Sequence, residues 1–181
     1  MSELLSRPFT VWLTGLTGAG KTTVAGLVSS ELERRGVLVD WLDGDAVRQH
    51  LSADLGFSKA DRDTNIARIS WIASRLTRAG AAVVVSAISP FAEARKRARE
   101  LIEPYGAFVE VYVAASVEVC ARRDVKGLYE RALRNELADF AGVTAPYEQP
   151  ANPEVRLDTE HETPTESAAI VLGYLERAGL V

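Results

Sequence analysis

The stretch Gly15-Leu16-Thr17-Gly18-Ala19-Gly20-Lys21-Thr22-Thr23 decides the fold of this chain. It fits the phosphate-binding pattern G-x-x-x-x-G-K-[ST], the P-loop, at every fixed position. The apolar, β-branched run 9–13 precedes it, and apolar residues recur at helical spacing in 24–32 behind it. This order of strand, glycine-rich loop and helix predicts an α/β fold with a nucleotide-binding loop.

The residue types of this loop suit phosphate binding. Its three glycines let backbone N–H groups approach phosphate oxygens with no Cβ in the way, and the following helix adds its positive end. We therefore expect a nucleoside triphosphate here, with Lys21 on its β- and γ-phosphates and the Thr22 hydroxyl on a bridging Mg²⁺. The residues expected to bind the nucleotide are Gly15, Gly18, Ala19, Gly20, Lys21, Thr22 and Thr23.

Length and composition narrow the class of protein. The 181 residues suit a single domain, 1–181, and a net charge of −4 argues against nucleic acid or an anionic membrane as partner. One cysteine, Cys120, excludes an internal disulfide and a thiolate zinc site, and we expect it to be a buried helix residue. Residues 1–8 lack a signal-peptide core and no apolar run is long enough to span a membrane, so we expect a cytoplasmic protein.

Strand and helix patterns alternate along the rest of the chain. Further strands are predicted at 37–42, 81–87, 108–113 and 155–157, with helices between them and a final helix capped by Thr163. Alternation of this kind implies a parallel five-stranded sheet flanked by helices. Residues 123–153 mix charge, glycine and proline, which predicts a mobile lid.

Polar residues follow directly after several of these strands. Ligands bind beyond the carboxyl ends of parallel strands, so we expect the P-loop, Asp43-Gly44-Asp45 and Ser89 to meet at one edge. P-loop hydrolases usually carry an acid at the end of a central strand, whereas 81–87 runs into Ile88-Ser89. The two carboxylates instead follow the second strand, where they would face an acceptor hydroxyl. This favours a small-molecule kinase over a GTPase or a motor.

Six short motifs carry a more specific resemblance. They are Leu42-Asp43-Gly44-Asp45-x-Val47-Arg48, Asp54-Leu55-Gly56-Phe57-Ser58, Asp61-Arg62-x-x-Asn65-Ile66, Ile88-Ser89-Pro90, Arg123-Asp124-x-Lys126-Gly127-Leu128-Tyr129 and Pro146-Tyr147-Glu148-x-Pro150. In these motifs the chain resembles the adenylyl-sulfate kinases. The resemblance implies a P-loop nucleoside/nucleotide-kinase-like fold and transfer of the γ-phosphate of ATP to the 3′-hydroxyl of adenylyl sulfate in sulfate assimilation. It also suggests a magnesium-dependent homodimer.

The resemblance assigns roles to the residues that match. Asp45 would orient or deprotonate the 3′-hydroxyl, and Asp43 with Thr22 would support the magnesium ion. Arg48, Arg62 and Asn65 would hold the phosphosulfate and the ribose of the acceptor. The implied catalytic residues are Lys21, Asp43, Asp45 and Ser89. The further implied substrate contacts are Phe57 and Phe140 on the adenine, Ile88, and Lys126 on phosphates. Arg122 and Arg123, next to Lys126, would neutralise charge in the transition state.

The sequence leaves some alternatives open. Ser89 would serve either as a contact to the substrate, which we favour, or as a phosphoserine intermediate. The acceptor could be another nucleotide-linked hydroxyl, such as a cytidine diphosphate derivative. A third function, a non-catalytic nucleotide-binding regulator, fits poorly with an intact Lys21, Thr22 and Asp45.

Overall fold

A parallel five-stranded sheet forms the centre of the molecule. The computed structural model describes residues 7–124 and 127–181. The strands pair in the order β2-β3-β1-β4-β5, and every pair is parallel, as predicted. Their bounds are Phe9–Thr14 (β1), Val39–Asp43 (β2), Ala82–Ser86 (β3), Ala107–Ala114 (β4) and Val155–Asp158 (β5).

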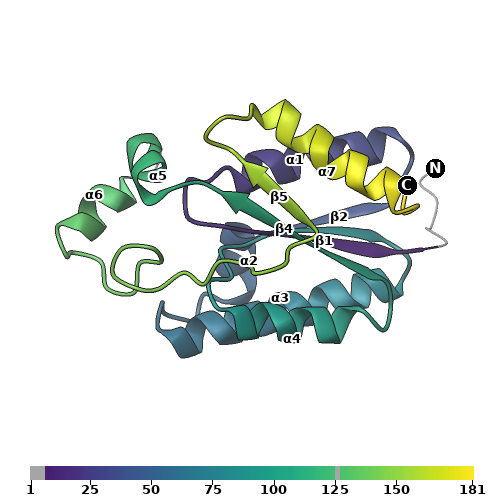
Figure 1. The fold of residues 1–181 in the computed structure, drawn as a ribbon. Helices are drawn as coiled ribbons and strands as arrows, with labels where there is room; N and C mark the ends of the chain where they lie inside the picture. Colours follow the sequence, from purple (N-terminus) through teal and green to yellow (C-terminus); the bar gives the residue numbers. More distant parts are fainter. Residues whose placement is uncertain (1–6, 125–126) are drawn as a thin grey trace.

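Helices cover both faces of the sheet. Figure 1 shows α1 and α7 on one face, α3 and α4 on the other, and α5 and α6 beyond the carboxyl ends of the strands. The sequence patterns did not predict α6, which lies inside the expected lid. The helices are α1 (Lys21–Arg34), α2 (Gly44–Leu51), α3 (Lys59–Arg78), α4 (Ala92–Ile102), α5 (Val117–Arg123), α6 (Leu128–Leu133) and α7 (Pro164–Arg177).

The central strand β1 is buried along its whole length and separates two cores. Alternate side chains of a strand point to opposite faces, so Val11 and Leu13 join the core against α1 and α7. Trp12 joins the second core, where its ring stacks on Phe108 with 5.8 Å between ring centroids. Packing on both sides therefore fixes the strand that leads into the P-loop.

Side-chain caps set where several helices begin. Asp43 accepts hydrogen bonds from the backbone N–H groups of Asp45 and Ala46, so α2 begins at Gly44. Thr163 and Glu166 form the expected capping box of α7. Cys120 lies buried in α5, which confirms the expectation from sequence.

Residues near the two ends of the chain lie together at the sheet edge opposite the P-loop (Figure 1). The Arg7 guanidinium donates a hydrogen bond to the carbonyl oxygen of Ala178 at 3.3 Å. Among the described residues, no helix combines the length and apolar character needed to span a membrane.

Candidate active site

A cavity of about 800 Å³ lies beyond the carboxyl ends of the strands, a size typical of ligand sites. The P-loop, the turn after β2 and the segment after β3 all line it, so the predicted convergence of these three segments is confirmed. The N-terminal part of α3 and residues 137–141 add further walls. The cavity therefore brings together groups that are far apart in the sequence.

The P-loop presents uncapped backbone N–H groups to the cavity. Gly20, the residue before α1, has φ of 106° and offers no side-chain cap, and Gly18 has φ of 77°. Both angles lie in the left-handed region that favours glycine. No side chain of Gly20 caps the first N–H groups of α1, and the residues that carry them line the cavity. Such N–H groups suit a bound anion.

Lys21 is buried beside this loop. Its ammonium donates to the carbonyl oxygens of Gly15 at 2.9 Å and Leu16 at 2.8 Å. A buried ammonium held by carbonyl oxygens keeps its charge near the place where phosphates would bind. Lys21 is also one of the residues that line the cavity.

The two residues predicted to support a metal lie side by side. The Thr22 hydroxyl donates to one carboxylate oxygen of Asp43 at 3.1 Å, and Ser86 donates to the same oxygen at 2.9 Å. No group of three or more His, Cys, Asp or Glu suited to a metal occurs in the described part of the chain. A hydroxyl and one carboxylate nevertheless fit Mg²⁺, which uses few protein oxygens and takes its other ligands from water and substrate phosphates.

Asp45 lies in the first turn of α2 and lines the cavity together with Lys21 and Thr22. Its own backbone N–H is bound by Asp43 at 3.0 Å. The side chain of Asp43 thereby ties the position of Asp45 to the metal-supporting pair. Asp43, the N-cap of α2, contacts Thr22, whereas Asp45 lies in the first turn of that helix.

The opposite wall of the cavity carries an aromatic ring with two guanidinium groups close to it. Phe57 is 56% exposed, and the Cζ atoms of Arg48 and Arg62 lie 4.5 and 5.6 Å from its ring centroid. Arg48 also donates to the carbonyl oxygens of Leu55 and Gly56, at 3.0 and 2.9 Å. Burial, followed by the charge of Arg48, lowers the pKa of Arg62. Two guanidinium groups close to one ring give this wall positive charge that suits an anion.

Asn65 lies on the same side of α3 as Arg62 and lines the cavity. It is 8% exposed, and its Oδ1 atom has no hydrogen-bond partner among the residues that the structure describes. An unpaired buried amide oxygen is unfavourable. A hydroxyl group of a bound ligand would satisfy it.

Phe140 differs from Phe57 in its surroundings. It is 8% exposed and packs edge-to-face on Tyr129, with 4.9 Å between ring centroids, although it also lines the cavity. Stacking of one base between Phe57 and Phe140 stays a prediction. Lys126 lies outside the described residues.

Ser89 has an unusual backbone conformation at the end of the segment after β3. Its φ is 40°, in the left-handed region, and it is 1% exposed. Its hydroxyl accepts a hydrogen bond from Trp12 Nε1 at 3.1 Å and donates to the Ala87 carbonyl oxygen at 3.3 Å. Ile88 and Ser89 both line the cavity, and such strained residues concentrate at functional sites.

Ser86, Tyr129 and Thr159 are cavity residues to which the sequence assigned no role. Besides Ser86, Tyr129 donates to the Thr17 carbonyl oxygen at 2.7 Å, and Thr159 donates to that of Ala19 at 2.8 Å. Thr159 follows β5, so the rule for strand ends could have found it. Tyr129 ends one of the family motifs quoted above, but the sequence assigned it no role and did not predict the helix α6 that carries it.

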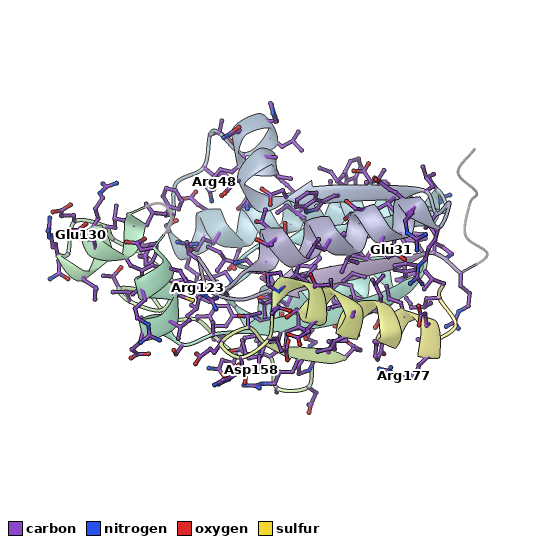
Figure 2. The ribbon with its side chains drawn as sticks, turned by 90° about the horizontal axis from the view of Figure 1, so that it is seen from above. Glu31, Arg48, Arg123, Glu130, Asp158 and Arg177 are labelled. Carbon is purple, nitrogen blue, oxygen red and sulfur yellow. The ribbon has the colours of Figure 1, made fainter. Side chains whose placement is uncertain are left out.

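Arg123 is the basic residue of α5 that lines the cavity; Arg122 does not line it. Arg123 donates to the carbonyl oxygen of Gly18 at 3.3 Å and to that of Thr159. Figure 2 shows Arg48 on α2 and Arg123 at the end of α5, both toward the P-loop end of the molecule, with Glu31 and Arg177 toward the other end.

Comparison with known sequences identifies the family that this chain resembles. Residues 7–158 match the sequence profile of the family described as Adenylylsulphate kinase. The adenylyl-sulfate kinase of Halothermothrix orenii is 53% identical over 172 residues, which cover 95% of this chain and 91% of that protein. A probable bifunctional SAT/APS kinase of Sorangium cellulosum is 50% identical, over 96% of this chain and 29% of that protein.

Solved structures agree with the sequences. The Mycobacterium tuberculosis APS kinase, solved in complex with AMPPNP and APS, superposes with a TM-score of 0.90 at 44% identity, over 94% of this chain and 98% of that one. A gluconokinase from Sinorhizobium meliloti shares the fold at 21% identity and a TM-score of 0.58. Fold, cavity and sequence similarity lead to one conclusion: this chain belongs to the adenylylsulphate kinase family, whose enzymes use ATP to phosphorylate adenylyl sulfate.

Proposed function

We propose that this enzyme moves the γ-phosphate of ATP to the 3′-hydroxyl of adenylyl sulfate within the single cavity described above, releasing ADP and 3′-phosphoadenylyl sulfate. One observation carries the proposal. A phosphate-binding loop and a wall of two guanidinium groups around an exposed ring face the same space of about 800 Å³. Such a space suits two anionic nucleotides, one of which must bring its γ-phosphate to a hydroxyl group of the other.

The donor side would bind ATP through the backbone of the P-loop. The N–H groups of residues 15–23 would hold the phosphate oxygens, and Lys21 would leave the Gly15 and Leu16 carbonyl oxygens for the β- and γ-phosphates. Its charge would then offset the negative charge that develops during transfer. The nearby Arg123, already bound to the Gly18 carbonyl oxygen, would add a second positive charge.

Thr22 and Asp43 would hold Mg²⁺. The ion would supply positive charge that neutralises part of the charge of the ATP phosphates. The contact between Thr22 and Asp43 at 3.1 Å supports this role.

The acceptor side would place the ribose hydroxyl in front of Asp45. Phe57, and with it Phe140, would stack on the base, since aromatic side chains stack on any base. Arg48 and Arg62 would bind the phosphosulfate, and the unpaired Oδ1 of Asn65 would accept from a ribose hydroxyl. Asp45 would then accept the proton of the 3′-hydroxyl as it attacks the γ-phosphorus.

Two neighbouring segments would complete the acceptor site. Ile88 and Ser89 would contact the acceptor beside Asp45, with Ser89 as a contact rather than a phosphorylated intermediate. Residues 123–153 would act as a lid of the single domain 1–181, carrying Lys126 toward the phosphates. Closure of the lid would exclude water, which otherwise competes with the 3′-hydroxyl for the γ-phosphate.

We further propose that the enzyme works as a homodimer in the cytoplasm, as the family resemblance suggests. Sedimentation equilibrium of the purified chain tests the assembly, and cell fractionation tests the compartment. A monomeric mass across the concentrations used in the kinetic assays would contradict the dimer.

An acceptor panel tests the reaction itself. The protein is incubated with Mg-ATP and adenylyl sulfate, its 3′-deoxy analogue, AMP or a cytidine diphosphate derivative, and ADP release is followed. We expect rapid release with adenylyl sulfate alone. Comparable turnover of AMP would mean that the sulfate end is not recognised, and faster turnover of the cytidine compound would identify a different acceptor.

A further inference from the structure

A buried arginine behind the cavity joins three segments of the chain. Arg95 on α4 is 3% exposed, and its Nε atom lies 2.8 Å from a carboxylate oxygen of Glu110 on β4. A buried charge of this kind is unfavourable unless it is paired and its other N–H groups find acceptors. The structure supplies two such acceptors, and both belong to segments that border the acceptor site.

The first acceptor is the carbonyl oxygen of Ser89, which one guanidinium nitrogen of Arg95 contacts at 2.8 Å. This is the residue with the left-handed φ of 40°. A non-glycine residue holds such a conformation only when its surroundings fix it. The hydrogen bond from Arg95 to the backbone of Ser89, with that from Trp12 to its side chain at 3.1 Å, supplies this constraint.

The second acceptor is the carbonyl oxygen of Glu148, at 2.7 Å from the other guanidinium nitrogen. Residue 148 lies near the end of the expected lid. Two more hydrogen bonds hold it to the segment after β3: its N–H donates to the Pro90 carbonyl oxygen at 2.8 Å, and its carboxylate accepts from the Ala92 N–H at 2.7 Å. The end of the lid and the segment that carries Ser89 are therefore joined through Arg95.

We propose that Arg95 is a positioning residue for the acceptor. Resting on the function proposed above, the inference is that its buried guanidinium holds the Ser89 backbone and the end of the lid at Glu148 in the arrangement that binds adenylyl sulfate. Arg95 is not among the residues that line the cavity. Its loss should therefore weaken acceptor binding and leave the ATP side unchanged.

Arg95→Lys is the first test. Lysine keeps a positive charge beside Glu110, but one ammonium cannot replace three guanidinium nitrogens that reach three acceptors in fixed directions. We expect the KM for adenylyl sulfate to rise by about tenfold or more, as for a lost hydrogen bond from a charged donor. The Kd of a non-hydrolysable ATP analogue should stay within about twofold of that of the wild type, because the P-loop contacts are unchanged.

Arg99→Lys is the matched control on the same helix. Arg99 pairs with Glu154 at 2.7 Å and Glu103 at 3.1 Å and lies 4.7 Å from the ring centroid of Phe108. Its hydrogen bonds go to these three residues rather than to Ser89 or Glu148. Its substitution should lower the melting temperature and leave both the acceptor KM and the affinity for the ATP analogue unchanged.

Glu110→Gln tests the charge of the ion pair apart from the contacts of Arg95 with the Ser89 and Glu148 carbonyl oxygens. Glutamine removes the negative charge but can still accept a hydrogen bond from Arg95 Nε. We expect it to keep the acceptor KM near that of the wild type. If Arg95→Lys does not fold, the double variant Arg95→Met/Glu110→Met removes the buried pair as a unit and carries the same expectation as Arg95→Lys.

Several outcomes would overturn the inference. They are a folded Arg95→Lys with an unchanged acceptor KM, an equal loss of ATP-analogue affinity, or the same rise in KM for Arg99→Lys or Glu110→Gln. A wild-type protein that does not turn over adenylyl sulfate would instead refute the proposed function. The two failures are therefore distinguishable.

Discussion

The donor and acceptor sides of the cavity are built by different parts of the chain. On the donor side, backbone N–H groups, glycines with φ above 70° and a buried Lys21 come from one contiguous loop behind a fully buried strand. On the acceptor side, side chains from α2, α3 and the loop between them surround an exposed Phe57. In the function proposed above, phosphate binding would therefore depend mainly on the backbone of one loop, and selection of the acceptor would depend on side chains from several segments.

Lys21→Ala should break the donor side completely. Lys21 supplies charge rather than core packing, so we expect kcat to fall by at least about 10³-fold, the upper end for a single lost transition-state donor, with the fold retained. Steady-state kinetics and circular dichroism of the purified variant check both points. Turnover near that of the wild type would mean that the donor side does not work as described.

Asp45→Asn tests the place where the two sides meet. The amide keeps the shape of the side chain but cannot accept the proton of the 3′-hydroxyl, so kcat should fall by about 10²-fold or more. The Kd of an ATP analogue, measured by calorimetry, should barely change. A collapse of ATP affinity with kcat preserved would assign Asp45 to the metal or to the fold instead.

Phe57→Ala and Phe140→Ala compare an exposed ring with a buried one. Loss of the Phe57 stacking surface should cost about 1–3 kcal/mol of acceptor binding, seen as a higher KM for adenylyl sulfate, with little change in the melting temperature. Phe140→Ala should lower the free energy of unfolding by about 3 kcal/mol, because its ring packs on Tyr129. If Phe57→Ala destabilises the fold and leaves KM unchanged, the exposed ring is not an acceptor contact.

Ser89→Ala should have a smaller effect on the acceptor side. A direct transfer does not need its hydroxyl, so we expect appreciable kcat and an acceptor KM raised roughly 3- to 10-fold, as for one lost hydrogen bond. Stereochemistry gives the independent check. Retention at a chiral γ-phosphorus would reveal two displacements and therefore a phosphoserine intermediate.

Glu31→Gln should leave both sides of the cavity unchanged. Hydrogen bonds from Arg34 and then Arg35 lower the pKa of Glu31 from 4.5 to about 2 in the folded chain. Because this pKa is lower in the folded chain, the ionised carboxylate stabilises the fold at pH values above about 4.5. The stabilisation is lost as the pH falls from about 4.5 toward 2. The variant should therefore flatten the acid side of a melting-temperature profile without altering kcat or KM. An altered acceptor KM would show that α1 couples this remote end to the cavity.

Much of the donor side could be predicted from the sequence because one local pattern specifies it. The strand 9–13, the glycines and the helix at Lys21 are adjacent in the chain, and each has a local physical reason. The convergence of Asp43, Asp45 and Ser89 followed from topology, since parallel strands end at one edge. The assignment of Cys120 to a buried helix position followed from its residue type.

The parts that could not be predicted depend on contacts between distant residues. The helix α6 is six residues long and follows Gly127, with φ of 64°, inside a stretch whose composition predicted only a loop. Ser86 and Tyr129 join the site through single hydrogen bonds to Asp43 and Thr17. No periodicity or motif predicts such bonds. The ion pair of Arg95 with Glu110 was likewise hidden, because a basic helix is usually a solvated one.

The meeting of Arg7 and Ala178 at the far edge of the sheet has a consequence for how such a chain can be extended. The cavity lies beyond the carboxyl ends of the strands, about 20 Å away along the six residues of β1. A connecting peptide that leaves the chain beside Ala178 starts behind the sheet, away from the mouth of the cavity. An extension of the chain from this edge therefore leaves the cavity open.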